Sequence, residues 1–163
     1  MRALLNMDRC NRQYWAFDSF EGFPAPQEED GEGGLNVGKA GGYAATQAEF
    51  EANMRTFRAW DDTRVHATKG WFNESIPTVA AAIGDIAFLR LDGDLYASTM
   101  DVLQLLYDQV SPGGLVYFDD WGSFNGCRRA IEAFRVERNV TSPINWIREY
   151  PGDGVEAVWW LKE

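Results

Sequence analysis

The chain has 163 residues, 45% of them hydrophobic, which suits one domain with a core of its own. Its formal net charge of −10 disfavours binding to nucleic acid, because phosphate backbones attract basic surfaces. No apolar stretch reaches the ~18 residues of a membrane span, and the N-terminal residues lack a signal-peptide core. Two cysteines are too few for a disulfide framework, so we expect a cytoplasmic protein with reduced thiols.

The N-terminal part of the chain predicts a strand followed by a long loop. Residues 1–9 have the pattern of the end of a helix, and the apolar residues 14–17 predict a buried strand that ends at Asp18. Glycine and proline are frequent in residues 21–42, and loops of this length are usually functional lids or disordered. Within this loop, the acidic run at residues 27–32 is expected to be a solvated surface segment.

The middle of the chain predicts one helix and two strands. A capping box over residues 46–49 predicts a helix that continues to about residue 60. Residues 64–68 predict a strand. Residues 86–91 are almost continuously apolar, as expected for a strand that is buried on both faces.

The C-terminal part predicts two helices and three strands. A helix is expected from residue 98 or 99 to residue 110, and a second over residues 125–139. Strands are expected at residues 115–118, 144–148 and 155–161. Alternating strands and helices predict an α/β domain with a largely parallel sheet. The last two strands have no helix between them, which indicates an antiparallel pair at the C-terminal end.

Acidic residues directly follow three of the predicted strands, at Asp18, Asp92 and Asp119. Ligands of open α/β sheets bind beyond the carboxyl ends of the strands, so we expect these residues to converge at one edge. Asp94 and Asp120 would join them there, and such carboxylates repel one another unless they are neutralised. A divalent cation such as Mg²⁺ prefers oxygen ligands, so a metal site is favoured over separate turn and helix-capping acids.

Two further motifs have a functional and a structural interpretation. The carboxylate of Asp18 could accept hydrogen bonds from a ribose diol, or it could form the turn after its strand. The residues alone do not decide between these two. The aromatic ring of Trp71, after Gly70, could stack on a planar ligand, although filling the core is the favoured role.

Several segments resemble the macrocin O-methyltransferase (TylF-type) family. They occur in family order over nearly the whole chain, and the one that contains Asp92 is long and specific. The segments are FDSFEGFP (17–24), GWF (70–72), LRLDGDLYAST (89–99), SPGG (111–114) leading into FDD (118–120), and GCRRA (126–130).

The resemblance implies a class I methyltransferase with a Rossmann-like sheet. Such an enzyme transfers a methyl group from S-adenosylmethionine to a hydroxyl of a small molecule, often a sugar of a natural product. It implies Mg²⁺ held by residues that match Asp92, Asp119 and Asp120, with Asp92 also a candidate general base.

The resemblance also implies a cofactor site. Asp18, with Ser19, would bind the cofactor ribose, and the segment from Asp61 to Trp71, which includes Gly70, would lie near the adenine. The region of Tyr43 would resemble the family's lid.

The chain departs from the family at its start. Family members begin with a strand, a glycine-rich turn and a helix that hold the methionine end of the cofactor. Here residue 1 already resembles the end of that helix, so we expect an incomplete single domain over residues 1–163. The absent strand would lie between the strands that end at Asp18 and Asp92. Exposed strand edges invite pairing with another chain, so a homo-oligomer is expected.

Two other functions are weighed. The Asp92-Gly93-Asp94 motif also resembles the nucleophile motif of haloacid dehalogenase-like, Mg²⁺-dependent phosphatases. Its position on the third strand and the presence of Tyr96 two residues later disfavour this alternative. The other possibility is a truncated, non-catalytic remnant that folds only as an oligomer.

Overall fold

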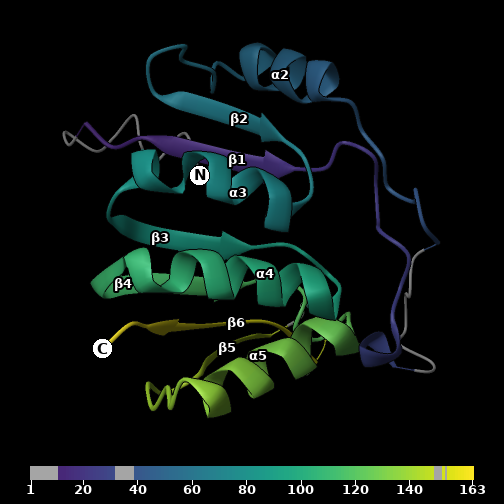
Figure 1. Cartoon of the computed structure of the whole chain (residues 1–163), viewed down its shortest axis with the longest axis vertical. Coiled ribbons are helices and arrows are strands. Elements are labelled where there is room, and N and C mark those ends of the chain that lie inside the picture. Colours follow the sequence, from purple (N-terminus) through teal and green to yellow (C-terminus); the bar gives the residue numbers. More distant parts are fainter. Residues whose placement is uncertain (1–10, 32–38, 149–151, 153) are drawn as a thin grey trace.

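The computed structural model describes residues 11–31, 39–148, 152 and 154–163, and its strands form two sheets. The helix end expected at residues 1–9 lies outside the described residues. The smaller sheet is a parallel pair, and the larger has four strands in the order β3-β4-β6-β5 (Figure 1). The strands are β1 (Tyr14–Asp18), β2 (Val65–Lys69), β3 (Ile86–Leu91), β4 (Val110–Phe118), β5 (Asn145–Arg148) and β6 (Val155–Leu161).

The four-stranded sheet is mixed. Strands β3 and β4 are parallel, with Leu91 opposite Phe118, so the residues that follow both strands emerge at one edge. Strand β6 is antiparallel to β4 and to β5. These pairings confirm the α/β class and the antiparallel C-terminal pair. Strand β4 starts at Val110, five residues earlier than the expected start at residue 115.

Four α-helices are present in the described residues. Helix α2 ends earlier than expected, and α3 was not predicted from the sequence, where Pro77 interrupts its pattern. Helix α3 nevertheless buries Ile76 completely, and this packing favours the helix despite the proline. Figure 1 shows α3, α4 and α5 over one face of the strands. The helices are α2 (Gln47–Thr56), α3 (Phe72–Ile83), α4 (Tyr96–Leu106) and α5 (Asn125–Glu137), with short 3-10 turns η1 (Glu28–Asp30) and η2 (Tyr107–Gln109).

The two sheets are not joined by strand pairing. In the described part of the chain, β1 pairs only with β2, and β3 pairs only with β4. Helix α3 contacts both β1 and α4, and so bridges the two halves. The break lies between the strands that end at Asp18 and Asp92, where the resemblance placed an absent strand.

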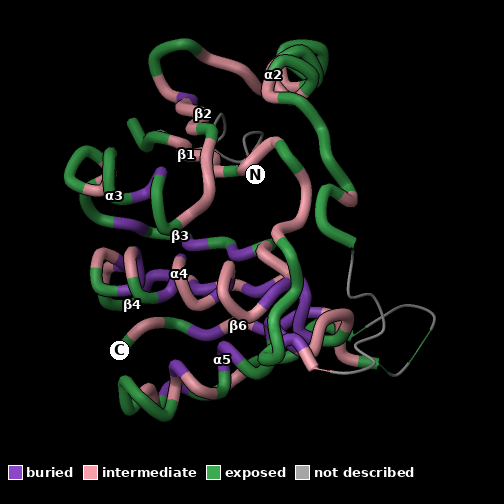
Figure 2. The backbone as a smooth tube through the Cα atoms, turned by 45° about the vertical axis from the view of Figure 1, so that its right-hand side comes forward, coloured by how far each residue is buried: buried purple, intermediate pink, exposed green. Residues whose placement is uncertain are grey.

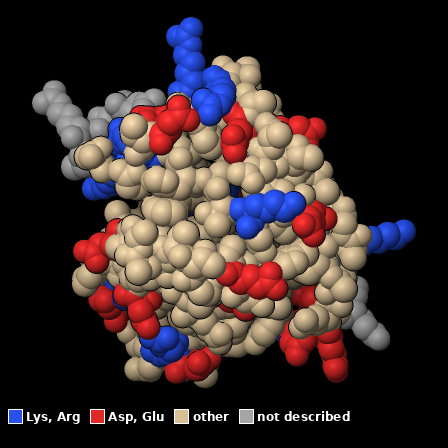
Figure 3. Space-filling model, turned by 45° about the horizontal axis from the view of Figure 1, so that its top comes forward, with Lys and Arg blue, Asp and Glu red and all other residues tan. Residues whose placement is uncertain are grey.

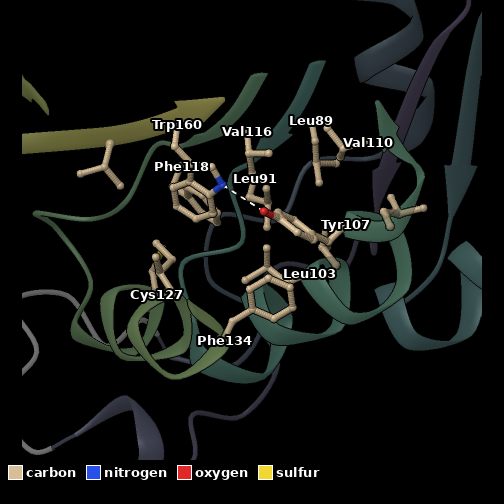
Figure 4. Packing of buried hydrophobic residues seen from close by; sticks show 14 of the residues in the cluster. Leu89, Leu91, Leu103, Tyr107, Val110, Val116, Phe118, Cys127, Phe134 and Trp160 are labelled. Atoms are coloured by element: carbon tan, nitrogen blue, oxygen red, sulfur yellow. Dashed lines mark hydrogen bonds between the residues drawn. The ribbon is translucent and has the colours of Figure 1, made fainter. Parts of the chain in front are cut away.

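The main core lies in the four-stranded half. Phe118 of β4 stacks on Trp160 of β6 at 4.7 Å between ring centroids, and Tyr107 meets Phe134 of α5 at 4.9 Å (Figure 4). Buried positions are spread over β3, β4, β6, α4 and α5, whereas α2 has none and is mostly exposed (Figure 2). The ends of β3 and β4 therefore rest on the best-packed part of the molecule. No helix in the described residues has both the length and the apolar character to span a membrane.

Replacing Phe134 by alanine tests this core. Phe134 is fully buried, so Phe134→Ala should lower the free energy of unfolding by about 3–5 kcal/mol in urea titrations. Phe57 is 81% exposed, and Phe57→Ala should change it by no more than about 0.5 kcal/mol. Equal effects of the two substitutions would contradict the packing of α5.

Candidate active site

A cavity of about 770 Å³ lies at the carboxyl ends of the strands, a volume typical of small-molecule sites. It brings together most of the residues singled out in the sequence. Residues from both sheets and from the loop between β1 and α2 line it. The expected residues in its lining are Asp18, Ser19, Gly70, Trp71, Asp92 and Asp120, whereas Asp119 is not part of the lining.

Three carboxylates form an acidic cluster in this cavity: Asp92, Asp94 and Asp120. One oxygen from each lies within 4.8 Å of the others. Asp92 directly follows β3, and Asp120 lies two residues beyond β4, so the parallel pairing of these strands places them together. The backbone carbonyl of Asp94 accepts a 3.1 Å hydrogen bond from the N–H of Cys127, which ties the turn to α5.

The cluster has unusual proton affinities. Burial, followed by the charges of Asp94 and Asp92, raises the pKa of Asp120 to about 8. Burial and the charge of Asp92 raise the pKa of Asp94 to about 6. Near neutral pH the pair therefore retains a proton, unless a cation takes its place.

The inner wall of the cluster contains an unsatisfied polar atom. Within the described structure, Oδ2 of Asp120 is buried without a hydrogen-bond partner. Buried polar atoms normally have one, so an unpaired carboxylate oxygen indicates a missing proton or cation. Three carboxylates with this geometry fit a hard divalent ion such as Mg²⁺.

Asp119 lies beside the cluster but is not one of its three carboxylates. Its carboxylate forms an ion pair with Arg90, whose other nitrogen lies 2.6 Å from Oδ2 of Asp92. The hydroxyl of Tyr117 donates a 2.6 Å hydrogen bond to Asp119, and burial together with this bond raises the pKa of Tyr117 to about 12. Arg90 was not singled out in the sequence. Its signal was the spacing of two from Asp92, which places both on one face of the strand.

The opposite side of the cavity carries the residues expected to bind the cofactor. Oδ1 of Asp18 accepts a 2.6 Å hydrogen bond from the N–H of Phe20, so this residue does form the turn after its strand. It also lines the cavity, together with Ser19. The N–H of Gly70 donates to the backbone oxygen of Asp18 at 2.9 Å, and Trp71 follows as the N-cap of α3. Adjacent strand ends therefore hold all of these residues at one place.

The β1–α2 loop (residues 19–46) contributes Phe23 and Tyr43 to an aromatic wall, which Phe124 at the start of α5 completes. The N–H of Phe23 donates to the carbonyl of Gly42 at 3.0 Å, which joins the two described limbs of the loop. Gly22 has φ +80, and a Cβ there would lie 2.4 Å from that carbonyl, so only glycine allows this approach. The ring of Phe23 lies 5.3 Å from Tyr43 and 6.0 Å from Phe124.

The acidic run in this loop is only partly as expected. Residues 27–29 are exposed, but Asp30 is buried, with 3% of its surface accessible. The expectation of a solvated segment is therefore wrong for Asp30, because its carboxylate accepts a hydrogen bond from the N–H of Tyr96 at the start of α4.

On the molecular surface, Figure 3 shows acidic and basic side chains interspersed on one face rather than a continuous basic patch.

An α/β sheet with an acid-lined cavity at its strand ends is the architecture of class I O-methyltransferases. Among solved structures, the O-methyltransferase NovP superposes with a TM-score of 0.82 at 31% identity, over 99% of this chain and 65% of that one. The profile of the macrocin O-methyltransferase (TylF) family matches residues 1–162. The chain belongs to this family.

Two curated relatives are similar in sequence. Demethyldecarbamoylnovobiocin O-methyltransferase of Streptomyces niveus is 35% identical over 147 residues, which cover 88% of this chain and 55% of that enzyme. Mycinamicin III 3″-O-methyltransferase of Micromonospora griseorubida is 33% identical over 142 residues, which cover 84% of this chain and 54% of that enzyme. The chain thus spans about half the length of these relatives. Membership of the family removes the support for a phosphatase.

The raised pKa of Asp120 predicts how stability depends on pH. The unfolded carboxyl loses its proton near 3.8 and the folded one near 8, so the native state binds more protons in between. In EDTA, the free energy of unfolding should therefore fall as the pH rises from about 4 to about 8. Asp120→Asn should flatten this decline, whereas Asp85→Asn, at an exposed site, should follow the wild type. Parallel curves for wild type and Asp120→Asn in chemical unfolding would contradict the prediction.

Proposed function

We propose that the protein is an S-adenosylmethionine- and Mg²⁺-dependent O-methyltransferase that acts on a hydroxyl of a small molecule, such as a natural-product sugar. The observation that carries the proposal is a single cavity with two different sides. One side holds Asp18 and Trp71, and the other holds the acidic cluster. Family membership supports the reaction class. A cytoplasmic location and a homo-oligomeric state are part of the proposal.

Each side of the cavity has its own task. When bound, S-adenosylmethionine supplies an electrophilic methyl group, and Mg²⁺ lowers the pKa of the hydroxyls that it contacts. The carboxylate of Asp18 would accept hydrogen bonds from the ribose, and the ring of Trp71 would face the adenine. The aromatic wall would hold the acceptor with its hydroxyl toward the acidic cluster, so that positioning lowers the barrier.

The proton of the acceptor hydroxyl must go to a group in the cluster. Asp92 is the proposed general base, since it lies at the end of β3 and is exposed to the cavity. Asp94 is a second candidate, because its pKa of about 6 is near the value that suits a base at neutral pH. Turnover of Asp92→Asn and of Asp94→Asn at saturating Mg²⁺ separates these roles, since the base variant loses turnover even when the metal is bound.

Asp92 and Asp120 would hold the metal with a third carboxylate. The sequence predicts Asp119 for this place, and the geometry of the cluster favours Asp94. Asp119 shares Arg90 with Asp92, so it lies next to the cluster but is already paired. Both assignments use oxygen ligands only, as Mg²⁺ requires.

Calorimetric titration with Mg²⁺ tests the metal site. Asp92→Asn and Asp120→Asn should each weaken binding by more than about tenfold, because each removes a charged ligand. Asp101→Asn is the matched control, since Asp101 lines the same cavity outside the cluster. Comparing Asp94→Asn with Asp119→Asn identifies the third ligand. If both Asp92→Asn and Asp120→Asn bound Mg²⁺ as tightly as the wild type, the acidic cluster would not be a metal site.

Binding of S-adenosylhomocysteine tests the cofactor side. Asp18→Asn keeps an oxygen for the turn but loses the charge, so affinity should fall by roughly 10- to 100-fold. Glu21→Gln is the control, because Glu21 is exposed and does not line the cavity. Equal affinities for Asp18→Asn and wild type would remove Asp18 from the cofactor site. A folded wild-type chain that binds no S-adenosylhomocysteine would instead favour the non-catalytic remnant.

A further inference from the structure

Asp30 is a buried carboxylate with both oxygens engaged, although it lies in an otherwise exposed acidic run. Its Oδ1 accepts a 2.7 Å hydrogen bond from the N–H of Tyr96, the first residue of α4. Its Oδ2 accepts another of 2.7 Å from the N–H of Gln27, which precedes η1. The neighbouring Glu28 and Glu29 are exposed. One side chain therefore connects the β1–α2 loop to the start of α4, which packs on the four-stranded sheet.

The start of α5 meets the same carboxylate. A Cβ added to Gly126, in the first turn of α5, would lie 2.2 Å from Oδ1 of Asp30, so glycine is required for this approach. Helix N-termini leave N–H groups unpaired and favour negative charge, so a carboxylate placed at two of them is stabilised. Arg129 of α5 also donates to the backbone carbonyl of Glu29. These contacts hold η1 against both helices.

The position of η1 bears on where Phe23, the part of the aromatic wall on this limb of the loop, lies. Phe23, Pro24 and Gln27 line the cavity between the turn after β1 and η1. The limb is anchored by the pairing of Phe23 with Gly42 at one end and by Asp30 at the other, where Arg129 also holds the carbonyl of Glu29. If Asp30 were released, the hydrogen bond from Arg129, at the exposed end of η1, would remain between this limb and the helices.

We propose that Asp30 is a positioning residue, which holds the aromatic wall at the distance from the acidic cluster that the acceptor requires. The inference rests on the proposed function and adds to it the residue that sets the acceptor side of the cavity. Asp30 also borders the cavity, but both of its oxygens accept hydrogen bonds from backbone N–H groups, so its proposed role is to hold the loop rather than to bind the acceptor. The cofactor side, at Asp18 and Trp71, lies on other strand ends and is independent of this anchor.

Three variants test the proposal: Asp30→Ala, Asp30→Asn and the control Glu28→Gln. Catechol, in buffer with Mg²⁺, serves as the acceptor probe, because its flat ring and adjacent hydroxyls match the aromatic wall and the acidic cluster. Asp30→Ala should raise amide hydrogen exchange over residues 22–31 and weaken catechol binding by roughly 10- to 100-fold. Its affinity for S-adenosylhomocysteine should stay within about twofold of wild type, because a displaced wall affects only the acceptor side.

The conservative variant separates positioning from general destabilisation. Asp30→Asn retains an oxygen for Tyr96 but offers an N–H to Gln27, so its exchange and catechol affinity should be intermediate. Glu28→Gln should behave as wild type. Thermal unfolding of each variant shows that it is folded, and Asp30→Asn serves if Asp30→Ala does not fold.

Several results would overturn the proposal. The first is hydrogen exchange in the Asp30 variants that equals the exchange in Glu28→Gln. The second is an unchanged affinity for catechol although exchange is faster. The third is a wild-type protein that does not bind catechol. Failure of the wild type to bind S-adenosylhomocysteine in the same samples is a separate outcome, which counts against the proposed function.

Discussion

The structure depends on one electrostatic constraint, the convergence of carboxylates at the ends of β3 and β4. Parallel pairing of Leu91 with Phe118 sends Asp92 and Asp120 to the same edge, and the turn adds Asp94. Three negative charges within 4.8 Å destabilise the fold unless protons, cations or arginine neutralise them. Burial together with this repulsion raises the pKa values of Asp94 and Asp120, and Arg90 pairs with Asp92. A bound divalent cation would also offset the repulsion.

The well-packed core keeps the ends of β3 and β4 together in spite of this repulsion. Phe118 immediately precedes the acids of β4 and is stacked on Trp160, so the strand end cannot move apart to relieve the repulsion. The two-stranded half is less buried and carries Asp18 at its own strand end. Helix α3 and the β1–α2 loop connect the halves, and the cavity lies between them. The proposed cofactor and acceptor sides thus lie on parts of the fold that differ in burial.

Membership of the TylF family and the geometry of the cavity support the same reaction class from independent directions. The family profile matches residues 1–162, whereas the chain spans about half the length of its curated relatives. Within the described residues, β1 and β3 each keep one unpaired edge, at the place where the family resemblance puts another strand. The β1–α2 loop contributes to this site more than an exposed connection would, since Asp30 fastens it to α4 and α5.

Most strand positions along the chain, the α/β class, the family and the strand-end positions of Asp18, Asp92 and Asp120 could be predicted from the amino-acid pattern alone. Apolar runs that stop at an acid are local signals, and parallel pairing converts them into one edge. Tertiary structure decided which acids meet: Asp94 joins the cluster, while Asp119 turns to Arg90 and Tyr117. It also decided that α3 forms around Pro77 and that Asp30 is buried. Neither follows from local sequence, because both depend on contacts with residues far away along the chain.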